Sequence, residues 1–372
     1  MNDPTPAQVM PYVLWGAFAL AFVFGLVGSK TNFCTMGAVS DWVNMGDKGR
    51  MRMWVLAIAV AILGANGLHL AGAIDLSKTL YQTPNFTWLS YIVGGLLFGI
   101  GMTLGSGCGS KTLIRIGGGN LKSVVVFIVI GISAYMTLKG LFGAFRVNVL
   151  EKATVVLPKG QDLPSLLSGP LDLSKGTLVL VLSLVIALAL IAWILSDREF
   201  RSSFDGLLGG IVTGLVAVGA MYVSGHVGYL AEDPNTLQEA FVGTNSGRME
   251  AFSFVAPLAY TLEYLMLWTD TSRVLTFGIV SVFGVVAGSF AWALINRSFR
   301  WEGFRDAADT GKHLIGGMLM GFGGVTALGC TIGQGISGVS TLALGSVVTL
   351  VSIVAGSAAT MKYEYWRLMQ EE

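Results

Sequence analysis

Charged side chains are scarce in this sequence, and their scarcity narrows the class of protein. Only 12% of the 372 residues are Asp, Glu, Lys or Arg, while 53% are hydrophobic. Soluble domains carry about 25% charged residues, so the chain has too few charges to cover the water-facing surface of an ordinary soluble domain. The composition therefore excludes that class of protein. The formal net charge of +1 also leaves no general basic face for binding nucleic acid.

Cysteine and histidine are also sparse, and this excludes further classes. Cys34, Cys108 and Cys330 are too few and too far apart for a disulfide framework. The three histidines show no ligand spacing, so we expect no metal site, and no motif points to a catalytic residue. The stretch before the first apolar run lacks the lysine or arginine of a secretory signal. We therefore expect that run to be a retained helix.

Long apolar runs are what the sequence has in abundance. A helix needs about 20 apolar residues to cross a bilayer, and about nine such stretches predict an all-α, polytopic transmembrane bundle. A weaker stretch at 251–269 contains Pro257 and Glu263, and we interpret it as a re-entrant or interfacial segment. The predicted spans are 10–29, 53–74, 91–108, 123–145, 176–196, 206–226, 274–295, 313–330 and 342–361.

The distribution of basic residues orients these spans. With nine spans and the N-terminus outside, most of the 23 lysines and arginines fall on the inner side, as the positive-inside rule requires. A further span at 251–269 would move the basic loop 296–312 outside, which favours nine. We therefore predict a multi-pass protein of the bacterial inner membrane, with the N-terminus outside and the C-terminus in the cytoplasm.

An internal repeat is visible at an offset of 222 residues. Residues 94–108 read GGLLFGIGMTLGSGC and residues 316–330 read GGMLMGFGGVTALGC, with seven identities in fifteen positions. The copies occupy the third and eighth predicted spans, so they run in opposite directions. Inverted repeats around a central site are a common transporter plan. We expect one membrane transport domain, 1–372, with repeat halves at 10–145 and 176–361 joined by 146–175.

Both copies of the repeat are rich in glycine, end in cysteine and are followed by more glycines. Such a run does not form a uniform helix across lipid, so it must be shielded by protein or line a polar cavity. The free N–H groups of a broken helix bind anions. Close packing of glycine-rich helices explains the glycines alone equally well, but the paired cysteines favour a re-entrant or broken-helix site. The candidate substrate-path residues are Cys34, Cys108, Cys330, Gly107, Gly329, Thr331, Gln334 and Lys111.

The cysteines suggest what such a site would handle. A lone membrane cysteine is usually a small apolar filler, but Cys108 and Cys330 share a position in the repeat. A thiol is a weak donor and a soft acceptor, suited to passing on a sulfur-bearing anion without a tight grip. Lys111 would add positive potential or is an ordinary inner-loop charge, while Thr331 and Gln334 would donate hydrogen bonds.

The combination resembles the YeeE/YedE family of sulfur-compound transporters. The similarity is carried by NFCTMGAVSDW at 32–42, GGLLFGIGMTLGSGC at 94–108, FRDAADT at 304–310 and GGMLMGFGGVTALGCTIGQG at 316–335. The resemblance implies import of thiosulfate along a path lined by Cys34, Cys108 and Cys330, without a cofactor. It also implies a helical bundle pinched at its centre, and a small sulfur-carrier or rhodanese-like protein as partner.

Other functions remain open at this point. A transporter of a different sulfur or selenium species would have the same overall pattern. A membrane sulfurtransferase with a reactive cysteine would need a base beside the thiol, and no histidine is near any of the three cysteines in the sequence. A subunit of a redox complex should show cofactor ligands such as paired histidines, and the sequence has none.

Overall fold

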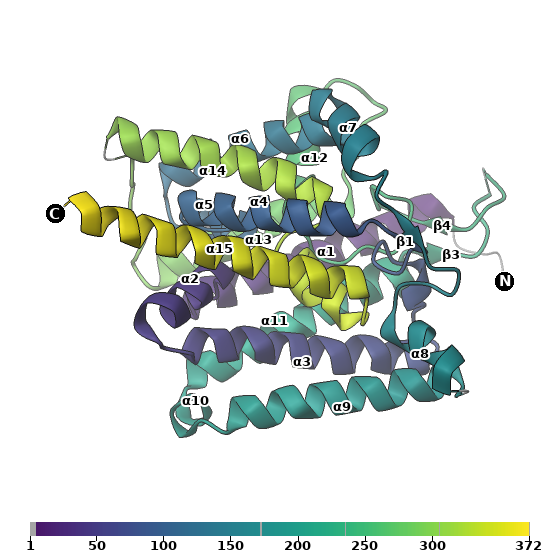
Figure 1. The fold of residues 1–372 in the computed structure, drawn as a ribbon. Helices are drawn as coiled ribbons and strands as arrows, with labels where there is room; N and C mark the ends of the chain where they lie inside the picture. The colour runs from purple at the N-terminus through teal and green to yellow at the C-terminus, as the bar shows by residue number, and fades with distance from the viewer. Residues whose placement is uncertain (1–4, 172, 235, 305, 372) are drawn as a thin grey trace.

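Helices dominate the fold, as predicted (Figure 1). The computed structural model describes residues 5–171, 173–234, 236–304 and 306–371, so residue 305 of the FRDAADT segment lies outside the description. The long helices are α1 (Pro6–Lys30), α3 (Gly49–Leu70), α4 (Trp88–Leu104), α6 (Leu121–Lys139), α9 (Lys175–Leu195), α11 (Phe204–Tyr222), α13 (Phe277–Ile295), α14 (Ala307–Thr326) and α15 (Leu344–Glu371).

Short elements connect the long helices. Two small antiparallel sheets pair β1 (Asn85–Phe86) with β2 (Val155–Val156) and β3 (Tyr229–Leu230) with β4 (Ala240–Phe241). The short helices are α2 (Thr35–Ser40), α5 (Gly109–Gly117), α7 (Leu141–Phe145), α8 (Leu163–Leu171), α10 (Arg198–Ser202) and α12 (Ala256–Met266). The remaining helical turns are η1 (Asp41–Met45), η2 (Leu76–Lys78), η3 (Arg146–Leu150), η4 (Val223–Val227) and η5 (Gly333–Gly338).

The predicted spans correspond to the long helices. In the described chain, eight of the nine coincide with helices that are long and apolar enough to cross a membrane. The other, 313–330, coincides with α14, which is less apolar because its first turns carry Asp309, Lys312 and His313. The segment 251–269 contains α12, whose 11 residues are too few to span a bilayer. The chain is therefore a polytopic helical membrane protein.

Several predicted boundaries are wrong. The spans 91–108 and 313–330 were extended to their cysteines, but α4 and α14 each end four residues earlier. The span 123–145 is interrupted at Gly140, whose extended backbone separates α6 from α7. The span 342–361 is too short, because α15 has 28 residues and is about 42 Å long, more than the roughly 30 Å of bilayer hydrocarbon.

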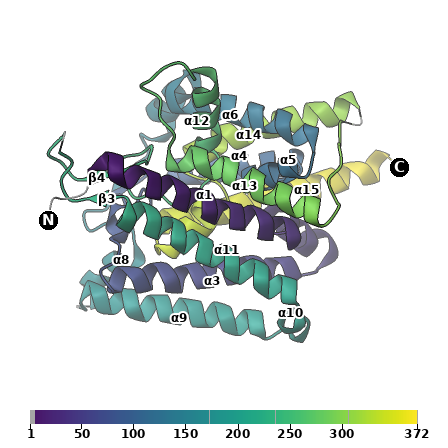
Figure 2. The same cartoon turned by 180° about the vertical axis from the view of Figure 1, so that it is seen from behind.

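The helix contacts form matching pairs, as a repeat would produce. Helix α4 packs on α15 as α14 packs on α6, and α1 packs on α13 as α11 packs on α3. Helix α9 has no such counterpart and lies against α3 at one edge of the bundle, which both views show (Figures 1 and 2). These contacts agree with two related halves, but the halves 10–145 and 176–361 stay a prediction.

The two copies of the glycine-rich repeat lie against each other along α4 and α14. A Cβ atom on Gly101 would lie 2.7 Å from the carbonyl oxygen of Gly316, and one on Gly323 would lie 2.6 Å from that of Gly94. The early part of each helix therefore faces the late part of the other, so the copies run antiparallel. The backbones approach so closely that only glycine fits at these positions.

The linker between the predicted halves is built into one end of the bundle. Gln161 is fully buried, and its side-chain amide donates to the Tyr91 hydroxyl at 3.3 Å. The backbone carbonyl of Gln161 accepts from the Leu344 amide at 2.9 Å. The backbone amide of Leu163 donates to the Leu342 carbonyl at 3.0 Å. Residues 161–163 therefore hold the turn that starts α15.

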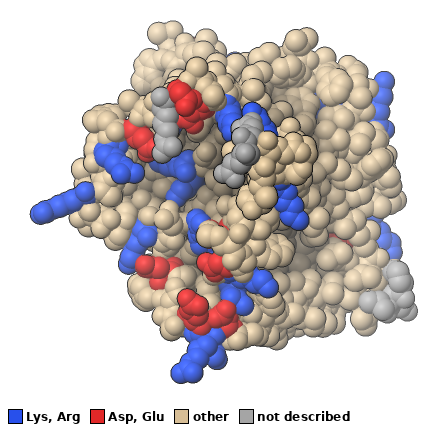
Figure 3. Space-filling view, turned by 60° about the vertical axis from the view of Figure 1, so that its left-hand side comes forward, with Lys and Arg blue, Asp and Glu red and all other residues tan. Residues whose placement is uncertain are grey.

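The opposite end of the bundle is charged. Figure 3 shows lysine, arginine and acidic side chains gathered on this face. The terminal one or two turns of α1, α3, α6 and α14 contribute Lys30, Arg52, Lys122 and Lys312. Their acidic partners are Asp205, Asp197, Asp309 and Glu364, respectively. The start of α1 and the end of α15 lie at opposite ends of the bundle (Figure 1), as nine crossings require.

We expect this charged end to face the cytoplasm, because basic residues are retained on that side during insertion. A reporter that is active only in the cytoplasm should be active when fused after α15 and inactive when fused before α1. Reporter activity at both termini, or at neither, would contradict nine crossings.

Candidate functional site

Each of the three cysteines follows the end of a long helix that closes in the same way. The amide of the residue before the cysteine donates to the carbonyl five residues further back, as in a Schellman motif. The residue two positions before the cysteine has a left-handed backbone, with φ of 56° at Asn32, 57° at Ser106 and 59° at Leu328. The donor–acceptor pairs are Phe33 to Gly28 at 3.1 Å, Gly107 to Met102 at 2.9 Å and Gly329 to Gly324 at 2.8 Å.

Each cysteine then begins a new helical segment. Cys34 and Cys108 have extended backbones and are the N-caps of α2 and α5. The Cys330 carbonyl accepts from the Gln334 amide at 2.8 Å, which starts the turn leading into η5. The predicted broken helices are therefore present, and Gly107 and Gly329 lie within the breaks, each next to its cysteine.

The thiols are free and buried, and they lie close to hydrogen-bond donors. Cys34 Sγ accepts from the Gly37 amide at 3.4 Å. Cys330 Sγ accepts from the amides of Phe254 at 3.2 Å and Gly333 at 3.5 Å. Cys108 Sγ lies 3.2 Å from the Ser110 hydroxyl. Amide hydrogens directed at sulfur provide the kind of environment that also favours an anion.

Cys108 is within electrostatic range of both Cys34 and Cys330. The Gly109 backbone packs against the carbonyl of Phe254, and a Cβ atom there would lie 2.2 Å from that oxygen. The amide of the same residue, Phe254, donates to Cys330 Sγ. Phe254 therefore contacts both the segment that follows Cys108 and the Cys330 thiol. The Phe254 ring stacks on Phe24, with centroids 5.7 Å apart.

Polar side chains beside the thiols have unused hydrogen-bonding capacity. Thr331 Oγ1 and Gln334 Oε1 are buried and have no hydrogen-bond partner among the described residues. Thr35 Oγ1, next to Cys34, is in the same state. The sequences CTMG at 34–37 and CTIG at 330–333 are alike, a similarity that the sequence analysis missed. Buried polar groups are rarely left unpaired in proteins, so these positions are suited to a polar ligand.

Cations gather around Cys34 rather than around Cys330. Lys111 Nζ donates to Asn32 Oδ1 at 2.8 Å and interacts electrostatically with Cys34, as does Arg115. The Arg50 guanidinium, which sequence reasoning missed, lies over Gly37 and pairs with Asp41. Of the predicted site residues, Lys111 therefore lies with Cys34, whereas Gly329, Thr331 and Gln334 lie with Cys330.

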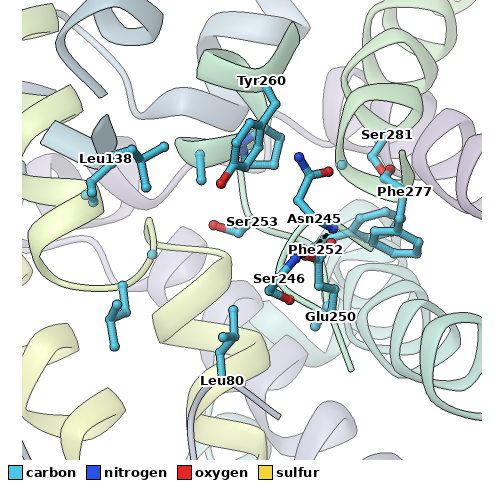
Figure 4. A pocket seen from close by; sticks show the side chains of 18 of the residues that line it. Leu80, Leu138, Asn245, Ser246, Glu250, Phe252, Ser253, Tyr260, Phe277 and Ser281 are labelled. Atoms are coloured by element: carbon cyan, nitrogen blue, oxygen red, sulfur yellow. Dashed lines mark hydrogen bonds between the residues drawn. The ribbon is translucent and has the colours of Figure 1, made fainter. Parts of the chain in front are cut away.

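A cavity of about 230 Å³ is lined by Gly329, the residue before Cys330. It is lined by the loop 245–253, by α12 and α13, and by Leu328 and Gly329 from the second break. Figure 4 shows Ser253 and Tyr260 among the lining side chains. Ser253 Oγ lies 4.0 Å from Cys330 Sγ. Arg146 also lines the cavity, and its buried Nε has no partner within the described chain.

The wall of this cavity is held by a buried acid on α12. Glu263 Oε1 accepts from the Tyr135 hydroxyl at 3.0 Å and pairs with Lys139 at 3.5 Å and Arg273 at 3.0 Å. These contacts tie α12 to α6 and to the loop before α13. The predicted re-entrant or interfacial segment is therefore a fixed part of the cavity wall.

Polar groups held at the centre of an apolar bundle, with a cavity leading to them, define a membrane transport protein. The chain belongs to the sulphur transport family, whose model matches residues 30–359. The expectation of a transporter rather than an enzyme is confirmed by this membership.

Two curated relatives are similar over nearly their whole length. A protein of Escherichia coli (strain K12) named thiosulfate transporter TsuA is 26% identical over 351 residues, which are 90% of each chain. A protein of Spirochaeta thermophila with the same name is 25% identical over 357 residues, 93% of this chain and 97% of that one.

Proposed function

We propose that the protein imports thiosulfate, or a closely related sulfur anion, across the inner membrane. The anion enters the cavity and passes Cys330, Cys108 and Cys34 in that order. The observation that carries this proposal is the set of three buried thiols, each at the start of a helical segment, with Cys108 within electrostatic range of both others. Membership of the sulphur transport family and the names of two relatives support the substrate.

The surroundings of the thiols suit a sulfur dianion. A dianion in bare hydrocarbon costs tens of kcal/mol, so it needs donors throughout its passage. Backbone amides and the Thr331 hydroxyl supply such donors near Cys330. The Gln334 side-chain nitrogen already donates to the Ala327 carbonyl at 2.6 Å, so Gln334 contributes polarity there rather than a free donor. Lys111, Arg50 and Arg115 supply positive charge near Cys34. The electrostatic attraction between the protein and the anion therefore increases towards the charged end of the bundle. This gradient favours movement of the anion towards the cytoplasm.

Uptake of radiolabelled thiosulfate into proteoliposomes containing the purified protein tests this function. We expect uptake above that of empty vesicles, inhibited by unlabelled thiosulfate more strongly than by sulfate or selenate. Stronger inhibition by a selenium anion would instead favour the selenium species as substrate. An absence of uptake of any of these anions would refute the proposal.

The Thr331 hydroxyl offers a specific test of the donors. Thr331→Val keeps the shape of the side chain but removes a buried hydroxyl that has no partner in the protein. We expect the free energy of unfolding to stay the same or rise by about 1 kcal/mol, because the desolvation penalty is removed. We expect uptake to fall several-fold, because the anion loses a donor.

Thr349→Val is the matched control for this measurement, since Thr349 Oγ1 is also buried and unpaired but belongs to α15. Melting temperatures should change similarly in both variants, while uptake should fall only in Thr331→Val. Normal uptake by Thr331→Val would remove this hydroxyl from the path.

We also propose that a small sulfur-carrier or rhodanese-like protein receives the anion at the charged end. The cations around Cys34 lie near this end, where a partner would collect the substrate. Such a protein enclosed in the vesicles should increase the rate of thiosulfate uptake. An unchanged rate would count against the partner but not against transport.

A further inference from the structure

The cavity beside Cys330 has two charged residues among those lining it, Arg146 and Glu250. Arg146 already pairs with Glu151, with Nη1 and Oε1 3.3 Å apart. Glu250 Oε1 accepts from the amides of Asn245 at 3.0 Å and Ser246 at 2.9 Å, and it forms no ion pair within the described residues. Figure 4 shows these three loop residues grouped together in the cavity wall.

The groups that face Glu250 from neighbouring elements are mainly neutral. Tyr81, from the loop before α4, and Tyr260, from α12, both lie within electrostatic range of this carboxyl. Tyr81 is also within electrostatic range of Cys330 and lines the same cavity as the acid. Ser224 of η4 donates to the Glu250 carbonyl.

The nearby cations do not neutralise Glu250. Lys78 of η2 pairs with Glu239, and Arg248, in the same loop as the acid, is exposed. Burial raises the pKa of the Glu250 carboxyl, and the hydrogen bonds from Ser246 and Asn245 oppose this only in part. Protonation of Glu250 is therefore easier than protonation of an acid on the surface.

We propose that the anion occupies this cavity together with a proton on Glu250, so that transport is linked to the outer pH. This inference rests on the proposed function. A dianion in the cavity repels an ionised Glu250 carboxylate. The bound anion therefore further favours the protonated form of Glu250. The proton comes from the outer water and converts the carboxylate to a neutral carboxyl. It is released when the anion leaves the cavity, and no bond to the anion forms or breaks.

The test measures the KM for thiosulfate uptake into proteoliposomes at a series of outer pH values. For the wild type, the KM should fall as the outer pH falls, by up to about tenfold per pH unit for one linked proton. Glu250→Gln keeps an oxygen that accepts from Asn245 and Ser246 but holds no charge. Its KM should be independent of pH and close to the low-pH value of the wild type.

Glu239→Gln is the matched control, because Glu239 lies in the same outer region but is not among the residues lining the cavity. It should keep the pH profile of the wild type. A wild type that takes up thiosulfate with a KM independent of pH would overturn this inference and leave the proposed function standing, as would a Glu250→Gln variant with the wild-type profile. A wild type without uptake at any pH would overturn both.

Discussion

Cys330→Ala and Cys108→Ala should each reduce thiosulfate uptake to background. Cys330 follows Gly329 of the cavity lining and its Sγ accepts two backbone amides, so its loss removes the soft contact nearest to the cavity. Cys108 is within electrostatic range of both other thiols, and no other thiol in the described structure replaces it. The measurement is growth on thiosulfate as the sole sulfur source, together with uptake by membrane vesicles.

The serine variants should also be impaired, because a hydroxyl is a harder partner for sulfur than a thiol. Cys34→Ala should have a milder effect, because Lys111, Arg50 and Arg115 still attract the anion there. Each variant should be present in the membrane at the normal amount, since losing one small side chain costs about 1 kcal/mol. Normal transport by well-expressed Cys108→Ala and Cys330→Ala would make the thiols packing residues.

Gly109→Ala should abolish uptake although it removes no polar group. The added methyl would lie 2.2 Å from the Phe254 carbonyl oxygen, an impossible contact that must push α5 away from residues 252–254. This movement separates Cys108 from the amide that bonds Cys330 Sγ. Overpacking of this kind costs about 1–3 kcal/mol, so we expect a folded protein with a lower melting temperature.

Gly118→Ala is the control, because it adds the same methyl at the C-terminal end of α5. There the nearest atom would be the Arg115 carbonyl oxygen at 3.4 Å, an ordinary contact. Uptake should therefore be close to that of the wild type. Equal uptake by the Gly109 and Gly118 variants would show that the spacing of Cys108 and Cys330 does not matter for transport.

Much of the fold could be predicted because lipid imposes strict rules on sequence. Apolar length placed the spans, and the repeat predicted that its two glycine-rich copies run in opposite directions. Their packing against each other along α4 and α14 was not predicted. The points at which the helices break could not be predicted in detail. The left-handed residues Asn32, Ser106 and Leu328 share no residue type, and only tertiary contacts keep Ser106 and Leu328 in a conformation that their side chains disfavour.

The candidate site was only partly readable from the sequence. The residues next to Cys330 were found because they follow a repeated Gly-Cys pair. Arg146 and Glu250 were missed because the cavity is assembled from segments far apart in the chain, among them Tyr81, Phe277 and Gly329. No local spacing relates such residues. The similarity of CTMG and CTIG was readable but lies outside the 222-residue offset, so the search for repeats did not find it.

The burial of Gln161 has a consequence for the biosynthesis of the protein. This residue leaves the ribosome long before Leu342 and Leu344, whose backbone groups complete its surroundings. Until then its backbone carbonyl lacks the Leu344 amide, although its side-chain amide can already donate to Tyr91 and Thr83. The turn that starts α15 is therefore closed only after the last helix has been made. A nascent chain lacking α15 contains all three cysteines but leaves the Gln161 backbone carbonyl without the Leu344 amide.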